Sequence, residues 1–165
     1  MKITHKKNEH RAKPSVYKIY YRPNSIIVDL ELTESCKYQL NGVDQGDWNK
    51  LIGVTSGVLG DASKCKTLMI GWRYLDGFEF GIYAHNPPST HRILPEENNS
   101  ILKSKSLKNH LEVLISDKII FDLNGQTIQI PNDLKFNFSR LVNPWFGGNN
   151  PAPQDIVFQI NYKIT

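Results

Sequence analysis

Side chains suited to binding a sugar or an acidic group occur together in residues 67–73 and 78–85. Both segments alternate apolar and polar residues, as half-buried strands do, and the Asp76-Gly77 pair between them is typical of a tight hairpin turn. Pairing the two strands would place four polar groups on one face: Arg73, Glu79, Tyr83 and His85. Small residues on that face would leave space for a ligand above the sheet: Gly71 and Gly81. The pattern predicts a polar groove, with an ordinary solvated face of cross-strand charge pairs as the alternative.

Two polar loops contain aromatic residues that could contribute to the predicted groove. Residues 44–50 place Trp48 among polar side chains, and residues 143–153 place Trp145 and Phe146 beside two glycines. Aromatic rings on loops stack on the apolar faces of sugar rings, and loops carry much of the function of proteins. The alternative is that these rings fold inward and close the ends of a sandwich. The sequence-based prediction assigns ligand binding to six residues: Trp48, Arg73, Tyr83, His85, Trp145 and Asn149.

Catalytic motifs are absent from the sequence. The chain has no Gly-x-Ser-x-Gly elbow, no phosphate-binding loop and no His-Glu-x-x-His zinc motif. Its two cysteines and five histidines are not spaced as metal ligands. We therefore assign no catalytic residue, no metal site and no cofactor. If the protein is an enzyme, Tyr83 would act as acid or base, His85 as base or charge neutraliser, and Arg73 would bind a substrate carboxylate.

Length and composition indicate a single globular domain. The 165 residues are 39% hydrophobic and 22% charged, with a net charge of +4. No apolar run reaches the ~20 residues that a membrane helix needs. Residues 1–13 hold much of the positive charge and are predicted to be a solvated basic tail before a domain at 14–165. A basic stripe with interleaved aromatics is missing, so no nucleic-acid partner is expected.

The hydrophobic pattern repeats every two residues along most of the chain. Expected strands cover residues 16–21, 25–33, 67–73, 78–85, 111–115, 118–123, 127–130, 134–138 and 155–164. Prolines interrupt the chain throughout, and only residues 47–51 and the polar loop 95–107 suggest a short helix. Many short strands between turns predict an all-β, single-domain antiparallel β-sandwich, most simply a jelly roll.

Three motifs resemble those of a known family: Trp48-Asn49-Lys50-Leu51-Ile52-Gly53, Ile70-Gly71-Trp72-Arg73, and Pro144-Trp145-Phe146-Gly147-Gly148-Asn149 with Pro151-Ala152-Pro153-Gln154-Asp155-Ile156. With them the chain resembles a family of small uncharacterised bacterial β-sandwich proteins common in Bacteroidetes. That family implies no function, but its architecture is similar to concanavalin-like jelly rolls, which include lectins, carbohydrate-binding modules and polysaccharide lyases.

The lyases of this architecture imply roles for three residues. In them a Tyr and a His or Arg on the concave sheet remove a proton beside a uronate carboxylate, roles that Tyr83, His85 and Arg73 would match. The Gln-x-His and Tyr-x-Lys-x-Gly-x-Tyr strand motifs of one lyase group are missing from this chain. The absence of these two motifs argues against lyase chemistry.

The leading functional prediction is a non-catalytic protein that binds a poly- or oligosaccharide. The alternatives are a polysaccharide lyase or glycoside hydrolase, and a structural or protein-interaction subunit that pairs through sheet edges, in which case a homo-oligomer is expected. The basic N-terminus lacks the apolar core of a signal peptide. A native start predicts the cytoplasm, whereas removal of a leader predicts the periplasm or the exterior.

Overall fold

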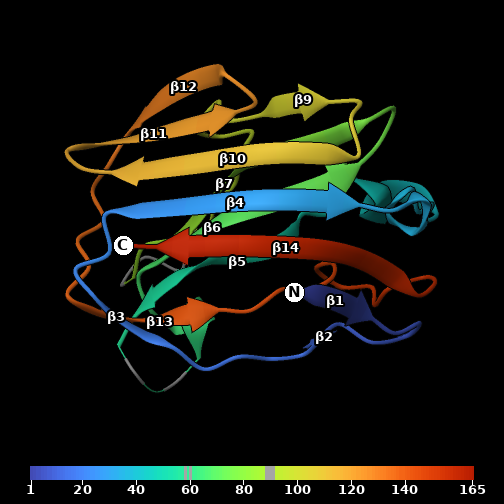
Figure 1. The fold of residues 1–165 in the computed structure, drawn as a ribbon, viewed down its shortest axis with the longest axis horizontal. Coiled ribbons are helices and arrows are strands. Elements are labelled where there is room, and N and C mark those ends of the chain that lie inside the picture. The colour runs from blue at the N-terminus through green and yellow to red at the C-terminus, as the bar shows by residue number, and fades with distance from the viewer. Residues whose placement is uncertain (58, 60, 88–91) are drawn as a thin grey trace.

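The fold consists of two antiparallel sheets that lie face to face (Figure 1). The computed structural model describes every residue except 58, 60 and 88–91. Sheet A, in front in Figure 1, has the order β12 (Gln126–Pro131), β11 (Lys118–Leu123), β10 (Lys108–Ile115), β4 (Ser25–Leu32), β14 (Ile156–Ile164), β1 (Lys2–His5) and β2 (Ala12–Lys13). Sheet B, behind it, has the order β3 (Ile19–Tyr21), β13 (Phe138–Val142), β5 (Asn49–Ser56), β6 (Thr67–Tyr74), β7 (Phe78–His85) and β8 (Arg92–Ile93), and β9 (Leu102–Ser104) also pairs with β7.

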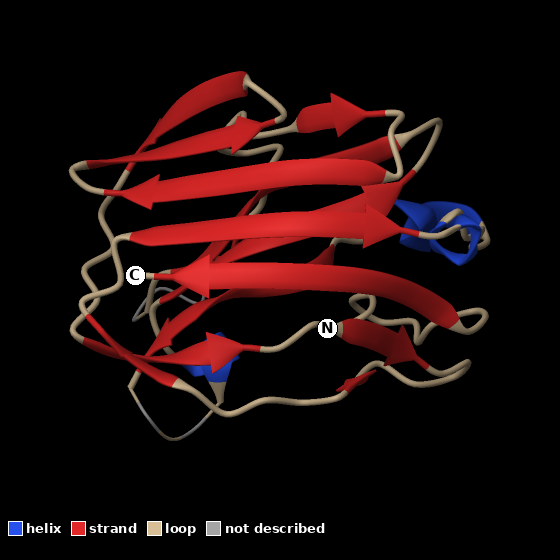
Figure 2. Ribbon diagram, in the orientation of Figure 1, coloured by secondary structure: helices blue, strands red, loops and turns tan. Residues whose placement is uncertain are grey.

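Helical structure in the described residues is limited to three short 3-10 segments, blue in Figure 2: η1 (Glu34–Cys36), η2 (Gly42–Gly46) and η3 (Ala62–Lys64). The predicted all-β antiparallel sandwich is therefore confirmed.

The core fills the space between the sheets and follows the predicted alternation. β4 turns Val28 and Leu30 inward and Asp29 outward, while β6 and β7 turn Trp72 and Phe80 inward. The expected hairpin between β6 and β7 is present, with Arg73 opposite Glu79 and Met69 opposite Tyr83. The other face of sheet B therefore carries the polar residues that the sequence pattern placed together.

Strand β5 differs from the sequence-based prediction, which assigned a helical turn to residues 47–51. β5 is a central strand, paired with β6 on one side and β13 on the other. Its run from Leu51 to Val54 does not alternate because both faces of the strand are covered. A register shift between Lys50 and Ile52 further disguises the period of two. The expected strand at 134–138 also differs, since β13 begins only at Phe138.

The N-terminal residues, predicted as a solvated tail, form part of sheet A. β1 pairs with β14, and β2 pairs with β1. Ile3 and His5 are fully buried, and the Met1 ammonium group donates to the Ile160 carbonyl at 2.7 Å. The segment is too short and too basic for its alternation to be visible, so its charge count suggested a tail.

The buried imidazole of His5 should make stability depend on pH. Its Nδ1 donates to the His10 carbonyl oxygen at 3.0 Å, and its Nε2 has no hydrogen-bond partner among the described residues. Burial lowers the pKa of His5 from 6.5 to about 4. Between these values the unfolded chain binds the proton more readily, so the free energy of unfolding should fall as pH drops from about 6.5 to about 4.

Urea denaturation of the parent and of His5→Phe across this pH range measures the effect. The variant cannot take up the proton, so its stability should change less on acidification. An equal loss of stability in both proteins would show that His5 does not cause it.

Candidate functional site

The outer face of sheet B contains two adjoining hollows, which together we call the sheet B groove. The larger hollow has a volume of about 500 Å³ and the smaller about 180 Å³, and Lys50 lines both. Met69, His85, Arg140 and Trp145 line the larger one, while Tyr83 and Arg92 line the smaller. The strand register explains this assembly, because alternate residues of β5, β6, β7 and β13 point to the same side of the sheet.

Lys50 lies where the two hollows meet. Its Nζ donates to the Gly147 carbonyl oxygen at 3.1 Å and lies 5.1 Å from the centre of the Tyr83 ring. Burial, together with the charge of Arg92, lowers the pKa of Lys50 from 10.5 to about 8. A carbonyl oxygen only partly compensates a buried ammonium group, so this cation retains the capacity to bind an anion.

Tyr83 and His85 lie side by side on β7, with ring centroids 5.3 Å apart. Burial raises the pKa of Tyr83, and Arg92 acts in the opposite direction. Burial also lowers the pKa of His85, and the charges of Arg92 and Lys50 lower it further. The groove therefore holds a neutral phenol and a neutral imidazole beside two cations at pH 7. These groups can donate hydrogen bonds, and the local positive charge favours an anionic ligand.

Trp48 and Arg73, both predicted to bind ligand, bind each other instead. The Arg73 guanidinium lies 4.3 Å from the centre of the Trp48 ring, and only 5% of Trp48 is exposed. Arg73 forms ion pairs with Glu79 at 2.7 Å and Glu96 at 2.5 Å, and the indole Nε1 donates to Glu96 at 2.9 Å. This cluster fastens the segment around Glu96 to sheet B. Trp48 reaches the smaller hollow only as part of its wall.

The two glycines expected to leave room for a ligand accommodate protein atoms instead. A Cβ at Gly71 would lie 3.1 Å from the Trp48 ring, and a Cβ at Gly81 would lie 2.5 Å from Pro95. The open part of the outer face of sheet B is therefore farther along the strands, over Met69, Tyr83 and His85. The sequence pattern identified the correct face of the hairpin. The space for a ligand, however, is not above Gly71 and Gly81, where it was expected.

Trp145 and Asn149 lie in the loop before β14. Trp145 is 36% exposed, stacks on the His10 ring at 5.2 Å, and exchanges two backbone hydrogen bonds with Lys50. Asn149 is exposed and its backbone N–H donates to Asp47 at 3.3 Å. Trp145 thus lines the groove, whereas Asn149 lies outside the residues that line it.

Of the six residues predicted from the sequence, four line the groove: Tyr83, His85, Trp145 and, as part of the wall of the smaller hollow, Trp48. The sequence-based prediction missed Lys50 and Arg92 because β5 and β8 were not recognised as strands, and it missed Arg140 because the expected strand ended at residue 138. The signal available for Lys50 was its position beside Trp48 in a segment that ends in an apolar run. Phe146 folds inward, as the alternative for these aromatic residues predicted.

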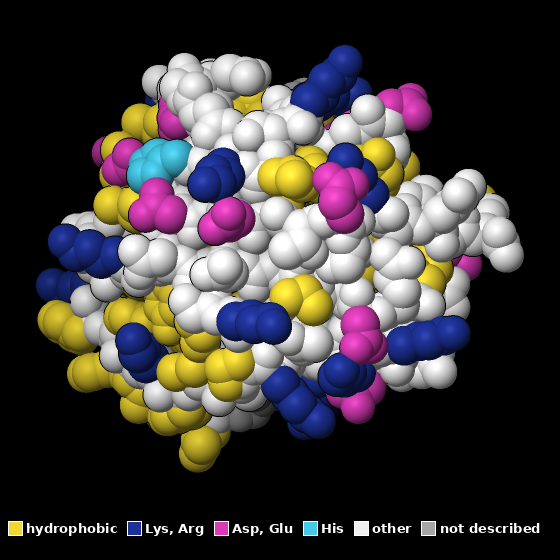
Figure 3. Space-filling view, turned by 45° about the vertical axis from the view of Figure 1, so that its right-hand side comes forward, with side chains coloured by type: hydrophobic (Ala, Val, Ile, Leu, Met, Phe, Trp, Pro, Cys, Tyr) yellow, Lys and Arg dark blue, Asp and Glu magenta, His cyan; other side chains and the backbone are white. Residues whose placement is uncertain are grey.

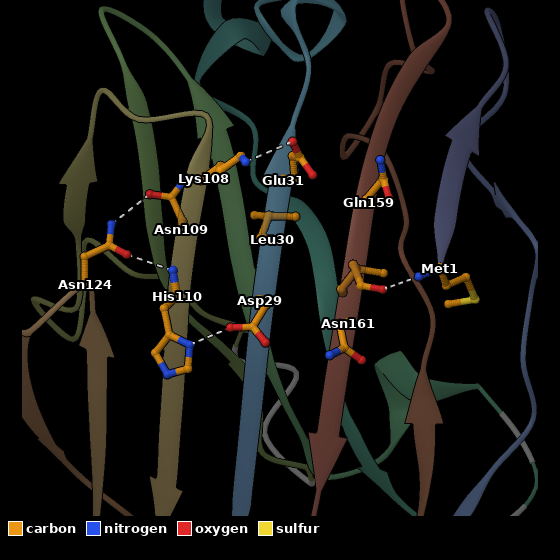
Figure 4. Close-up of a pocket in the computed structure, with 11 residues that line it drawn as sticks. Met1, Asp29, Leu30, Glu31, Lys108, Asn109, His110, Asn124, Gln159 and Asn161 are labelled. Carbon is orange, nitrogen blue, oxygen red and sulfur yellow. Dashed lines mark hydrogen bonds and ion pairs between the residues drawn. The ribbon is translucent and has the colours of Figure 1, made fainter.

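A separate hollow of about 490 Å³ lies on the outer face of sheet A (Figure 4). Its charged groups pair across strands, with His110 2.7 Å from Asp29 and Lys108 3.6 Å from Glu31. It has no aromatic wall other than the His110 imidazole, and its charges largely cancel. This face therefore resembles a solvated sheet surface, and we place the candidate site on sheet B.

Within the described residues, no three His, Cys, Asp or Glu side chains gather as a metal site would require. No helix in that part of the chain is long and apolar enough to cross a membrane.

Comparisons with known proteins define the fold class. No protein-family model and no curated protein matches the sequence. The structure is similar to alginate lyase vAL-1 from a Chlorella virus, with a TM-score of 0.59 and 12% identity over 99% of this chain and 83% of the lyase. It is also similar to a glycoside hydrolase family 16 endo-glucanase from Bacteroides ovatus, with a TM-score of 0.58 and 11% identity over 99% of this chain and 80% of the enzyme.

Alginate lyase AlyC3 gives a TM-score of 0.56 and 10% identity over 99% of this chain and 74% of the lyase. At such identities the likeness establishes the jelly-roll fold alone. The concanavalin-like architecture implied by the sequence resemblance is thus confirmed, while the narrower bacterial family remains a prediction.

Proposed function

We propose that the protein binds a carbohydrate chain in the sheet B groove without cleaving it. The observation that carries the proposal is the groove itself, whose two adjoining hollows are lined by Lys50, Tyr83, His85 and Trp145. An exposed indole suits the apolar face of a sugar ring, and the surrounding donors suit its oxygen atoms. The similar structures act on polysaccharides by their names, which supports a carbohydrate ligand on this fold.

The positive charge of the groove favours a sugar ligand that carries carboxylate groups. The groove is lined by more basic than acidic side chains: Arg11, Lys50, Arg92 and Arg140 against Asp47, Asp61 and Glu96. The lowered pKa values of Lys50 and His85 reflect burial among like charges. A carboxylate placed between these groups would relieve that repulsion and form charge-assisted hydrogen bonds. Alginate, which the similar lyases are named for, is therefore a suitable acidic probe.

Trp145→Ala tests the sugar-binding proposal. The variant should bind alginate oligosaccharides about tenfold more weakly, because it loses the exposed ring surface while the backbone pairing with Lys50 can persist. A glycan array with acidic and neutral polysaccharides, probed with the parent and the variant, measures this. Tyr17→Ala, which removes an exposed ring outside the groove, is the matched control. Absence of binding by the folded parent would reject the proposal.

A lyase is the second candidate, favoured by the contact between Tyr83 and His85. Its third predicted member, Arg73, is held by Glu79 and Glu96 and does not line either hollow. The raised pKa of Tyr83 also disfavours the phenolate that proton removal by this residue would need. Incubation of the protein with alginate distinguishes the candidates, because a lyase releases unsaturated ends that absorb ultraviolet light and a binding protein does not.

A further inference from the structure

Three large apolar side chains are exposed at the end of sheet B that is formed by β3 and β13. Tyr21 is 61% exposed, Phe138 60% and Ile19 49%. The rings of Tyr21 and Phe138 lie against each other, with their centroids 5.1 Å apart. Figure 3 shows hydrophobic side chains gathered low on the left of the molecule, the region where Figure 1 places β3 and β13. We call Ile19, Tyr21 and Phe138 the aromatic platform.

The aromatic platform lies on the same face of sheet B as the groove. In the register of these strands, Phe138 is opposite Tyr21 and Arg140 is opposite Ile19. Ser139 and Tyr20, the residues between them, point to the interior, since Ser139 is fully buried and Tyr20 packs on the core. Side chains alternate along a strand, so the platform residues share the outer face with Arg140.

Arg140 also lines the larger hollow of the groove, which makes the platform continuous with it. From β7 across β6, β5 and β13 to β3 there are four steps between neighbouring strands, or about 19 Å at about 4.8 Å each. A surface of this length, with cations at one end and aromatic rings at the other, matches an extended chain of repeating units better than a single small molecule.

We propose that the aromatic platform is the distal part of the carbohydrate site, and that a bound polysaccharide crosses the strands of sheet B from Lys50 and His85 to Tyr21 and Phe138. The inference rests on the proposed function and adds the direction and the minimum length of the ligand. Sugar rings present apolar faces that suit Tyr21 and Phe138, and Arg140 lies between these two rings and the cations of the groove.

A second copy of this chain is the main competing occupant. A stable dimer buries about 800 Å² on each partner, whereas patches of a few hundred Å² are common on monomers. The platform consists of three side chains, two on the three-residue strand β3 and one on β13, and falls in the smaller class. The platform also adjoins a charged groove, so a ligand that covers both must have polar and apolar parts. A saccharide chain has both.

The test compares ligand length. Calorimetric titration of the parent with an alginate octasaccharide and an alginate trisaccharide should give affinities at least about tenfold apart, because only the longer chain reaches both ends. The double variant Tyr21→Ser, Phe138→Ser should lose this difference and keep the affinity for the trisaccharide. Leu114→Ser, at an exposed apolar residue on sheet A, is the matched control and should retain the difference.

The other possible results separate failure of the platform from failure of the proposed function. If the parent binds both lengths with equal affinity, or the double variant keeps the length dependence, the platform is not part of the site while the proposed function stands. If the parent binds neither saccharide, the proposed function itself fails. A concentration-dependent dimer in sedimentation experiments that the double variant abolishes would assign the platform to self-association instead.

Discussion

Replacing Lys50 by methionine is expected to weaken the binding of alginate oligosaccharides roughly 10- to 100-fold, the range of one hydrogen bond to a charged group. Lys50 is the cation shared by both hollows, so its removal affects any ligand that occupies the groove. Methionine keeps the length of the side chain, and removing a partly buried charge that is compensated by a carbonyl oxygen and the Tyr83 ring, and not by an ion pair that would be broken, should not destabilise the fold strongly. Calorimetry gives the affinity, and thermal unfolding checks the fold.

Lys50→Arg and a change of pH sharpen this prediction. With a pKa of about 8, Lys50 loses its proton as the pH rises through that value, so parent affinity for the acidic ligand should fall in the same range. Arginine stays charged, and the variant should retain its affinity at higher pH. His85 also faces this region, but an imidazole does not gain positive charge as pH rises.

Lys163→Met, on the outer face of sheet A, is the control for loss of one positive charge. An equal loss of affinity in Lys163→Met and Lys50→Met would show that overall charge, and not the sheet B groove, attracts the ligand.

Replacing Phe146 by alanine is expected to lower the free energy of unfolding by roughly 3–5 kcal/mol, as for other large rings removed from a core. Phe146 has no exposed surface, and its ring contacts those of His5, Tyr38 and Trp72. The ring also anchors the loop that carries Trp145 and the carbonyl group of Gly147 that Lys50 contacts. Loss of stability should therefore accompany loss of ligand affinity.

Urea denaturation measures the change, with Phe138→Ala as the matched control. Phe138 is mostly exposed, so its replacement should change stability by less than about 0.5 kcal/mol. Similar values for the two variants would contradict the buried, anchoring position of Phe146.

The sequence predicted the architecture well where one face of a strand is buried and the other is wet. β4 and β14 alternate clearly because their outer residues, such as Asp29 and Asn161, meet solvent. β5 was missed because both its faces are covered and a register shift between Lys50 and Ile52 breaks the pattern. β1 was missed because a four-residue strand gives too few residues for a period to be visible.

The candidate site was harder to predict than the fold. Alternation identified the face that carries Tyr83 and His85, and this depended only on local strand geometry. Arg73 and Trp48 are not available to a ligand because both bind Glu96, which lies in a loop that covers the other end of the same hairpin. Contacts between distant segments of this kind leave no signal in a single sequence, because neither charge pairing nor packing has a fixed spacing.

The most direct test of the central claim is a nuclear magnetic resonance titration of isotope-labelled protein with alginate oligosaccharides. If the sheet B groove binds the ligand, the resonances of Lys50, Tyr83, His85 and Trp145 should shift in proportion to saturation, while those of Asp29 and His110 on sheet A stay unchanged. Shifts confined to sheet A, or no shifts in the folded protein at saturating oligosaccharide, would contradict the claim that this groove is a carbohydrate site.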